Sequence, residues 1–178
     1  MIRIDSRDKL MACDEMESPD RSYADLAQAI RRYCHESVIR ENNRELFDRL
    51  IFNIFVSNDD DHLRNHGFVW DVRLPGWRLS PLYDVMPRAT LASERRLHLG
   101  VGPEGRSATL DNAFAGRETF TLAADTAAQS ISRIWKTVRE WKMLFEEYNV
   151  PADQIEKIVP AFRHIDEVST PALRKLIP

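Results

Sequence analysis

The segment Ser57–Gly67 concentrates side chains that can carry out acid–base and metal chemistry. Its sequence, SNDDDHLRNHG, holds three aspartates, two histidines, one arginine and two asparagines. Asp60 and Asn65 have the spacing D-x-x-x-x-N, which is typical of loops that catalyse phosphoryl transfer. In such loops a carboxylate orients the proton of the attacking hydroxyl, and an amide oxygen binds a Mg²⁺ that bridges phosphates. The spacing leaves one residue of slack, so Asp59 and Asp61 remain alternative bases.

A second carboxylate has to reach the metal from a neighbouring segment, as the Asp of D-F-G does in protein kinases. Asp84 in SPLYDVMP is the candidate, because it follows directly after a predicted β-hairpin. Arg64 is the candidate for positive charge near the transferred phosphate. The plainer interpretation of the acidic run is a solvated loop that ends a helix.

Two apolar elements are expected to hold this segment in place. Before it, apolar residues in two adjacent i,i+4 rows predict the broad face of a central helix that ends at Ser57. These residues are Leu46, Phe47, Leu50, Ile51, Ile54 and Phe55. After it, Phe68–Val72 and Trp77–Ser80 flank the turn-forming LPG and predict a β-hairpin. Polar groups on a loop that a rigid scaffold supports are where function concentrates.

Most of the remaining chain is predicted to be helical. Ser22 and Asp25 resemble a capping box at the start of one helix. A short helix is expected over Thr109–Ala115, and two long amphipathic faces are expected over Ile131–Phe145 and Ile155–Ile165. The expected fold class is therefore mainly α, a helical bundle with a small β-hairpin that carries the polar loop.

Composition and charge narrow the class of protein. The 178 residues fit one domain, predicted over 1–178, with residues 1–20 as a connecting segment that holds at most a short strand at Met1–Asp5. A hydrophobic share of 43% and a charged share of 30% exclude a disordered chain, and no apolar stretch approaches a membrane span. Two cysteines and no visible secretory signal indicate the cytoplasm. The net charge of −3 predicts no direct DNA binding.

The motifs resemble those of a known family. NDDDHLRNHGF followed by GWRLSPLYDVMP is similar to the HipA-like serine/threonine kinases, whose C-terminal lobe carries a D-x-H-x-K/R-N loop and a P-x-Y-D element. SYADLAQAIRRY, LFDRLIFNIFVSN and LHLGVGPEGRSATLDNAF resemble that family as well. The resemblance covers about residues 20–160 and is specific, because several motifs recur in order at matching intervals. It implies a kinase-like C-lobe of the HipA type.

The resemblance also implies roles for single residues. Asp60 corresponds to the catalytic base, Asn65 to a Mg²⁺ ligand, and Asp84 to the metal-binding aspartate in the D-F-G role. His62 corresponds to a structural brace of the loop. Arg64 stands where many relatives have lysine, which keeps the charge but replaces a compact ammonium by a planar fork. The implied cofactors are Mg²⁺ and ATP.

The chain departs from a complete kinase at its front. A kinase needs a Gly-rich cover over the phosphates and an N-lobe lysine that pairs with them. No glycine precedes Gly67, and Lys9 is the only lysine before Lys136. We therefore expect these residues to correspond to the C-lobe alone, to bind ATP weakly, and to be inactive or nearly so unless another chain supplies the N-lobe.

The family also suggests partners. HipA-like kinases are commonly the toxin partner of a DNA-binding helix-turn-helix antitoxin. The resemblance implies a HipB-like antitoxin or a separate N-lobe chain as partner, and a protein substrate such as an aminoacyl-tRNA synthetase. The alternative function is a non-catalytic interaction module that binds such a partner without turnover.

Two weaker motifs have other interpretations. Gly100–Gly105 matches the dinucleotide fingerprint G-x-G-x-x-G, but it contains Pro103 and no βαβ unit surrounds it, so we expect a polar turn. The acids and histidines of the loop, with Asp84 and His98, are alternative ligands of a metal-dependent phosphohydrolase.

The large aromatic and basic residues of the helices are expected to be structural. Trp135, Trp141 and Phe145 are predicted to pack in the core of a long helix rather than anchor a partner. The arginines of the first two helices are predicted to be solvated and partly paired with glutamates rather than to form a basic face for a partner. They are Arg31, Arg32, Arg40, Arg44 and Arg49.

Overall fold

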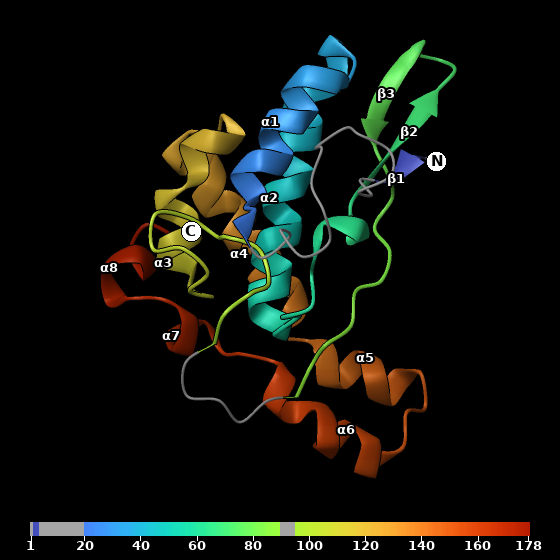
Figure 1. Cartoon of the computed structure of the whole chain (residues 1–178). Helices are drawn as coiled ribbons and strands as arrows, with labels where there is room; N and C mark the ends of the chain where they lie inside the picture. The colour runs from blue at the N-terminus through green and yellow to red at the C-terminus, as the bar shows by residue number, and fades with distance from the viewer. Residues whose placement is uncertain (1, 4–19, 90–94) are drawn as a thin grey trace.

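The computed structural model of the protein describes residues 2–3, 20–89 and 95–178, which form a mainly helical fold with a small antiparallel sheet (Figure 1). In chain order the elements are β1 (Ile2–Arg3), α1 (Tyr23–Tyr33), η2 (Glu36–Val38), α2 (Ile39–Val56), η3 (Leu63–Asn65), β2 (Gly67–Asp71), β3 (Gly76–Leu79), α3 (Leu110–Ala115), η4 (Arg117–Phe120), α4 (Ala124–Val138), α5 (Trp141–Glu147), α6 (Ala152–Ile158), η5 (Val159–Ala161), α7 (Ile165–Val168) and α8 (Pro171–Arg174). The mainly α class with a small hairpin is confirmed. Most of the predicted connecting segment, residues 4–19, lies outside the described residues.

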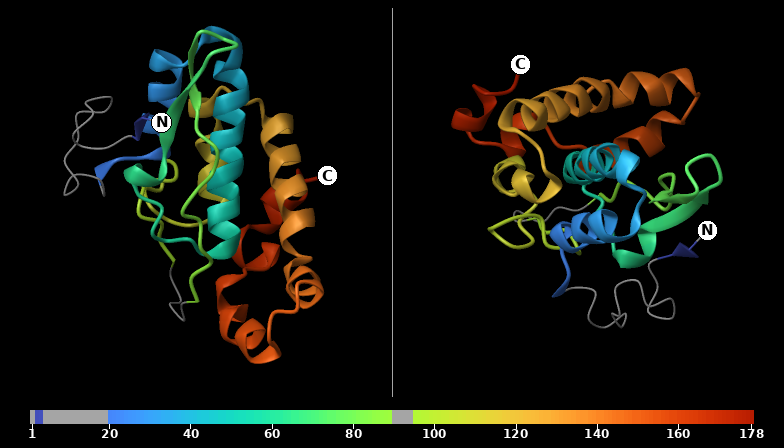
Figure 2. Two further views of the ribbon diagram at one scale, coloured as in Figure 1. Left: turned by 90° about the vertical axis from the view of Figure 1, so that its right-hand side faces the viewer. Right: turned by 90° about the horizontal axis from the view of Figure 1, so that it is seen from above.

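Helix α2 lies at the centre of the fold. In the view from above it has α1 on one side and α4 on the other (Figure 2). Its predicted apolar rows are buried, with Phe47 and Phe55 fully enclosed and Phe47 packed edge to face against Phe120. Burying each such side chain contributes about 1.5–3 kcal/mol, so this face organises the core.

The C-terminal end of α2 fixes where the polar loop begins. Ser57 adopts a left-handed backbone with φ 53°, and its N–H donates to the backbone oxygen of Asn53. The Asn58 N–H donates to the same oxygen at 3.0 Å, and Asn58 Nδ2 donates to Asn53 Oδ1 at 3.1 Å. This left-handed cap ends the helix at the predicted residue and turns the chain away from the helix axis.

The hairpin forms as predicted. β2 pairs antiparallel with β3 in a register that runs from Phe68 opposite Leu79 to Asp71 opposite Gly76. β1 pairs with the other edge of β2, so the strand order is β1-β2-β3. Phe68 and Leu79 are both buried. The polar loop therefore leads from a buried helix directly into a buried strand.

The two long amphipathic faces predicted for the C-terminal half are wrong in detail, because each is interrupted. α4 ends at Val138 and α5 begins at Trp141 in a new direction. α6 ends at Ile158 and is followed by η5, whose Pro160 lacks the N–H that an α-helix requires. α5 and α6 lie at the end of the molecule opposite the hairpin (Figure 1). None of the helices within the described ranges has the length and hydropathy needed to cross a bilayer.

The aromatic residues of this half have two different roles. Trp135 stacks on Phe55 with ring centroids 5.4 Å apart and packs against the core, as expected. Trp141 and Phe145 instead surround Phe162 in a half-buried cluster, with the Trp141 and Phe162 rings stacked at 4.0 Å. No residue of α5 is buried, so the prediction of core packing is wrong for these two aromatics.

One arginine of α2 also differs from the prediction. Arg49 is 4% exposed, pairs with Glu45 and donates to the backbone oxygen of Ser80 at 2.5 Å. It therefore ties α2 to the chain after β3 and is not a solvated charge. The other four arginines of the predicted set are exposed.

The glycine-rich segment after His98 is a turn, as expected. Gly102 and Gly105 form an antiparallel bridge, and Gly105 has φ 64°, a conformation that glycine adopts without steric cost. A Cβ at Gly102 would lie 2.1 Å from the backbone oxygen of Asn112, so the turn packs tightly against α3.

Replacing Ser22 by alanine is expected to lower the free energy of unfolding by about 1 kcal/mol. The predicted capping box is present: the Asp25 N–H donates to Ser22 Oγ at 3.3 Å, and the Ser22 N–H donates to Asp25 Oδ2 at 2.8 Å. Urea unfolding followed by circular dichroism measures the loss, and Ser22→Thr should restore most of it. An unchanged midpoint in Ser22→Ala would contradict a stabilising role for this cap.

Candidate functional site

The loop Ser57–His66 contains both residues of the D-x-x-x-x-N pair. Asn65 is buried at the end of η3, and its Nδ2 donates to the backbone oxygen of Asp60 at 3.1 Å. Among the described residues no donor reaches Asn65 Oδ1. The Asp60 side chain is 63% exposed. One hydrogen bond thus connects the Asn65 side chain to the backbone of Asp60. The Asp60 carboxylate takes no part in this bond and is exposed.

The segment that carries Asp84 lies beside the loop. The Tyr83 hydroxyl donates to the backbone oxygen of Arg64 at 2.8 Å, and the Arg88 N–H donates to the backbone oxygen of Val56 at 3.3 Å. These two contacts bracket Asp84, whose side chain is exposed and whose backbone is left-handed with φ 55°. Aspartate tolerates this conformation better than most residues do. Asp84 therefore directly follows a residue, Tyr83, whose side chain contacts the loop.

Arg88 bridges two of the three consecutive aspartates. Its Nε lies 3.2 Å from Asp59 Oδ1, and its Nη1 lies 3.3 Å from Asp60 Oδ2. All three side chains are between 40% and 63% exposed. Exposed ion pairs contribute about 0–1 kcal/mol, so this contact can open at little cost. The carboxylate of Asp60 is accordingly paired but accessible.

Asp61 is the buried member of the three aspartates. At 2% exposure it accepts hydrogen bonds from the Tyr23 hydroxyl and, at 3.0 Å, from His66 Nε2. Asn53 Nδ2 donates to the Tyr23 oxygen at 3.0 Å. His66 Nδ1 is buried without a partner among the described residues. This network ties the middle of the loop to α1 and α2.

The environment shifts the pKa values of this network in opposite directions. Burial would raise the pKa of Asp61. The positive charge of His66, its hydrogen bond and the hydrogen bond from Tyr23 outweigh this effect, so the pKa lies below its ordinary value. Burial and the neighbouring Asp61 carboxylate raise the pKa of Tyr23 well above its ordinary value. The carboxylate therefore stays charged and the phenol stays neutral. Asp61 acts as an acceptor that holds the loop, whereas the carboxylates of Asp59 and Asp60 are accessible.

His62 and Arg64 lie on either side of Leu63 at the start of η3. The His62 ring is half-buried and packs edge to face against His98, with centroids 5.9 Å apart. Burial, with a smaller contribution from Arg106, lowers the pKa of His98. Arg64 is exposed, and its backbone oxygen receives the Tyr83 hydroxyl. The brace role of His62 and the phosphate role of Arg64 stay predictions.

The oxygen ligands of the site suit magnesium better than a transition metal. Among the described residues no group of three or more His, Cys, Asp or Glu side chains is arranged to hold a metal ion. The phosphohydrolase alternative stays a prediction. Magnesium keeps bound waters and takes one or two carboxylates together with substrate phosphates. Asn65 Oδ1 and the Asp84 carboxylate have the oxygen chemistry that such an ion requires.

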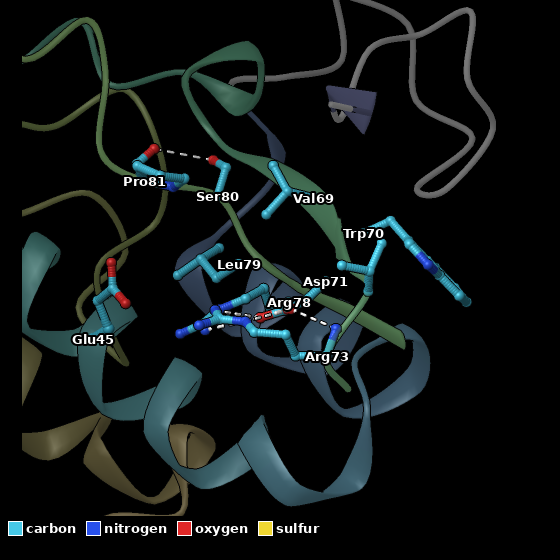
Figure 3. Close-up of a pocket in the computed structure, with 10 residues that line it drawn as sticks. Glu45, Val69, Trp70, Asp71, Arg73, Arg78, Leu79, Ser80 and Pro81 are labelled. Atoms are coloured by element: carbon cyan, nitrogen blue, oxygen red, sulfur yellow. Dashed lines mark hydrogen bonds and ion pairs between the residues drawn. The ribbon is translucent and has the colours of Figure 1, made fainter. Parts of the chain in front are cut away.

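A separate hollow of about 450 Å³ lies between the hairpin and α2 (Figure 3). No residue of the loop lines it. Its charged residues already pair with one another: Arg73 and Arg78 contact the Asp71 carboxylate at 3.0 and 3.4 Å. These hydrogen bonds, first of all that of Arg73, hold the pKa of Asp71 well below its ordinary range. The hollow is therefore distinct from the candidate site.

Sequence reasoning missed several residues that position the loop. Tyr23 and Asn53 contact Asp61 or its partner, and Arg88 contacts Asp60 from the segment after Asp84. Arg88 directly follows Pro87, the last residue of the motif that carries Asp84, so its place in the sequence was a usable signal. Tyr23 offered no such signal, because an aromatic residue at a helix start is ordinary in a core.

These elements define a mainly α domain with a small antiparallel hairpin and a polar loop between its central helix and that hairpin. The chain matches the family model of the HipA-like C-terminal domain over residues 3–142 and belongs to that family. No curated protein sequence matches the chain.

The fold is also similar to a solved structure. The match is to HipA in the complex of HipA, HipB and operator DNA of the Shewanella oneidensis MR-1 toxin–antitoxin system. The TM-score is 0.59 with 17% sequence identity, over 79% of this chain and 33% of that one. The chain therefore spans about a third of the length of this relative. At this identity the match establishes the likeness of the fold.

Proposed function

We propose that the chain is the C-terminal lobe of a HipA-like protein kinase that transfers phosphate from Mg²⁺-ATP to a serine or threonine hydroxyl. The observation that carries the proposal is the hydrogen bond from Asn65 to the backbone of Asp60, together with the contacts that bind the Asp84 segment to the same loop. Membership of the HipA-like C-terminal domain family supports it.

In this proposal each residue has one task. The exposed Asp60 carboxylate accepts or orients the hydroxyl proton of the substrate. Asn65 and Asp84 would hold Mg²⁺, which when bound neutralises the charge of the ATP phosphates and orients them. The Asn65 side chain is pre-oriented for this task, because its Nδ2 donates to the backbone oxygen of Asp60 and its Oδ1 is the acceptor atom that can bind a cation.

A second candidate function is a non-catalytic interaction module. No glycine precedes Gly67 and Lys9 is the only lysine before Lys136, so these residues contain neither the Gly-rich cover nor the usual N-lobe lysine in its ordinary place. The similar HipA structure contains HipB and operator DNA. The module would then bind a HipB-like antitoxin or a separate N-lobe chain without turnover.

Replacing Asp84 by asparagine is expected to lower the affinity of the chain for Mg²⁺-ATP by at least about tenfold. Asparagine tolerates the left-handed backbone of this position, so the substitution removes charge without forcing the chain to move. Because these 178 residues hold no glycine before Gly67 that could form a phosphate cover, we expect the unmodified chain itself to bind more weakly than about 100 μM. Isothermal titration calorimetry with Mg²⁺-ATP measures both values.

A matched control is Asp153→Asn, which removes an exposed aspartate on α6 that pairs with Lys157. The affinity should not change in this variant. Equal affinity of Asp84→Asn and the unmodified chain would contradict the metal role of Asp84. A folded chain that binds no Mg²⁺-ATP at millimolar concentration would favour the interaction module.

A further inference from the structure

The end of α2 is held by segments that are remote in the sequence. The last carbonyl groups of a helix have no partners within it and need donors from elsewhere. The backbone oxygen of Phe55 accepts from the N–H of Arg163 at 2.8 Å, and that of Val56 accepts from the N–H of Arg88. One of these donors belongs to the segment of Asp84, and the other lies near the C-terminal end of the described chain.

Arg95 reinforces the same junction. Its Nη1 donates to the Ser57 hydroxyl, and its Nη2 donates to the backbone oxygen of Pro160 at 2.8 Å. Ser57 is buried and left-handed, and it is the residue at which the loop leaves α2. One planar guanidinium thus joins the first residue of the loop to η5, with the forked geometry that arginine alone provides.

Aromatic packing holds these segments together from the other side. Trp135 of α4 stacks on Phe55, and its ring meets His164 edge to face with centroids 4.8 Å apart. Aromatic pairs of this kind stabilise a contact beyond the area that they bury. The backbone contact of Arg163 therefore lies next to an apolar contact that keeps it in register.

The geometry points to a positioning role for the segment Val159–Ile165, which we name the C-terminal clamp. We infer that the clamp, through Arg95, fixes the start of the loop Ser57–His66 and so keeps Asp60 and Asn65 at the separation that the proposed phosphoryl transfer needs. The inference rests on the proposed function for its catalytic consequence. The clamp lies beyond residue 142, where the match to the family model ends.

A second set of contacts holds the loop at Asp61, so we expect loss of the clamp to affect one part of the loop more than the other. Asp61 binds Tyr23 and His66 independently of Arg95, and the N–H of His66 donates to the backbone oxygen of Leu63 at 3.1 Å. Loss of the clamp should therefore loosen residues 57–62 more than residues 63–66. Local openings of this kind are measurable residue by residue through amide hydrogen exchange.

The test compares amide exchange by NMR in the full 178-residue chain and in Arg95→Ala. The amides of Asn58, Asp59 and His62, which are hydrogen-bonded within or beside the loop, should exchange at least about tenfold faster in the variant. The amide of His66 and those of α1 should keep their rates. Arg95→Lys, which keeps the charge but not the fork, should fold normally and give an intermediate increase.

The matched control is Arg40→Ala, because Arg40 is an exposed arginine at the N-terminal end of α2, opposite the end that carries the loop. Its loop amides should exchange as in the unmodified chain. Unchanged loop exchange in both Arg95 variants, or faster exchange by the same factor at every amide, would overturn the clamp. This readout does not need nucleotide, so a failure of the proposed kinase function would leave the result on the clamp intact.

Discussion

Replacing Asp61 by alanine is expected to lower the free energy of unfolding by about 3–5 kcal/mol, the largest change in stability predicted for any residue of the loop. The substitution leaves two buried donors, the Tyr23 hydroxyl and His66 Nε2, without their common acceptor. Each such loss costs about 1–3 kcal/mol, and the cavity left by the carboxylate adds to it. Urea unfolding followed by tryptophan fluorescence measures the change.

The adjacent Asp59 provides the control. It is half-exposed, and its contact with Arg88 is an exposed ion pair, so Asp59→Ala should change stability by less than about 1 kcal/mol. Similar losses in the two variants would show that the buried network around Asp61 does not anchor the loop.

The pH dependence gives an independent check of the same network. The pKa of Asp61 is lowered in the folded chain, so the unfolded chain binds its proton first as the pH falls. The stability that the charged carboxylate contributes is therefore fully present above about pH 4 and is lost as the pH falls below it. The difference in unfolding free energy between the unmodified chain and Asp61→Asn should shrink in the same range. A constant difference from pH 7 to pH 3 would contradict this role of the charge.

The parts of the fold that the sequence predicts best depend on local patterns. Two adjacent apolar rows with a polar run after them determine where α2 lies and where it ends. A capping box fixes the start of α1, and a turn between two alternating stretches fixes the hairpin. These signals are strong because each arises within one element and does not need a distant partner.

The different environments of the three aspartates cannot be predicted from such local patterns. Asp59, Asp60 and Asp61 are chemically identical and adjacent, so spacing alone cannot separate a base from an anchor. What separates them is a tertiary contact, since Tyr23 reaches Asp61 from α1 while Arg88 reaches the other two from the Asp84 segment. The same reason explains the burial of Arg49, whose partner Ser80 lies after the hairpin.

The apolar periodicity of the sequence also does not predict the break between α4 and α5. The apolar positions on both sides continue at helical spacing, but Trp135 has Phe55 as its partner and Trp141 has Phe162. A periodic pattern reports that residues share a face, not which neighbour covers that face. The C-terminal clamp is placed beside the loop by contacts between residues remote in the sequence, such as Arg163 with Phe55, and no local pattern predicts them.

Phosphoryl transfer from Mg²⁺-ATP to protein is expected to fall about 10²–10⁴-fold when Asp60 is replaced by alanine, the contribution typical of a positioned general base. Asp60 is the exposed aspartate that the Asn65 side chain holds through its backbone, whereas Asp61 is committed to Tyr23 and His66. Incorporation of radiolabel at high protein concentration measures the rate, which we expect to be low because these 178 residues hold no glycine before Gly67 that could form a phosphate cover.

Asp59→Ala decides between the neighbouring carboxylates, because it removes an acid of similar exposure that shares the same Arg88. Its transfer rate should stay within a few-fold of the unmodified chain if Asp60 is the base. A collapse of the rate in Asp59→Ala with an unchanged rate in Asp60→Ala would reverse the assignment. A binding measurement distinguishes loss of the catalytic base from loss of the metal site. Asp60→Ala should retain its affinity for Mg²⁺-ATP, whereas Asp84→Asn should not, because in the proposed function Asp60 moves a proton and Asp84 holds the metal.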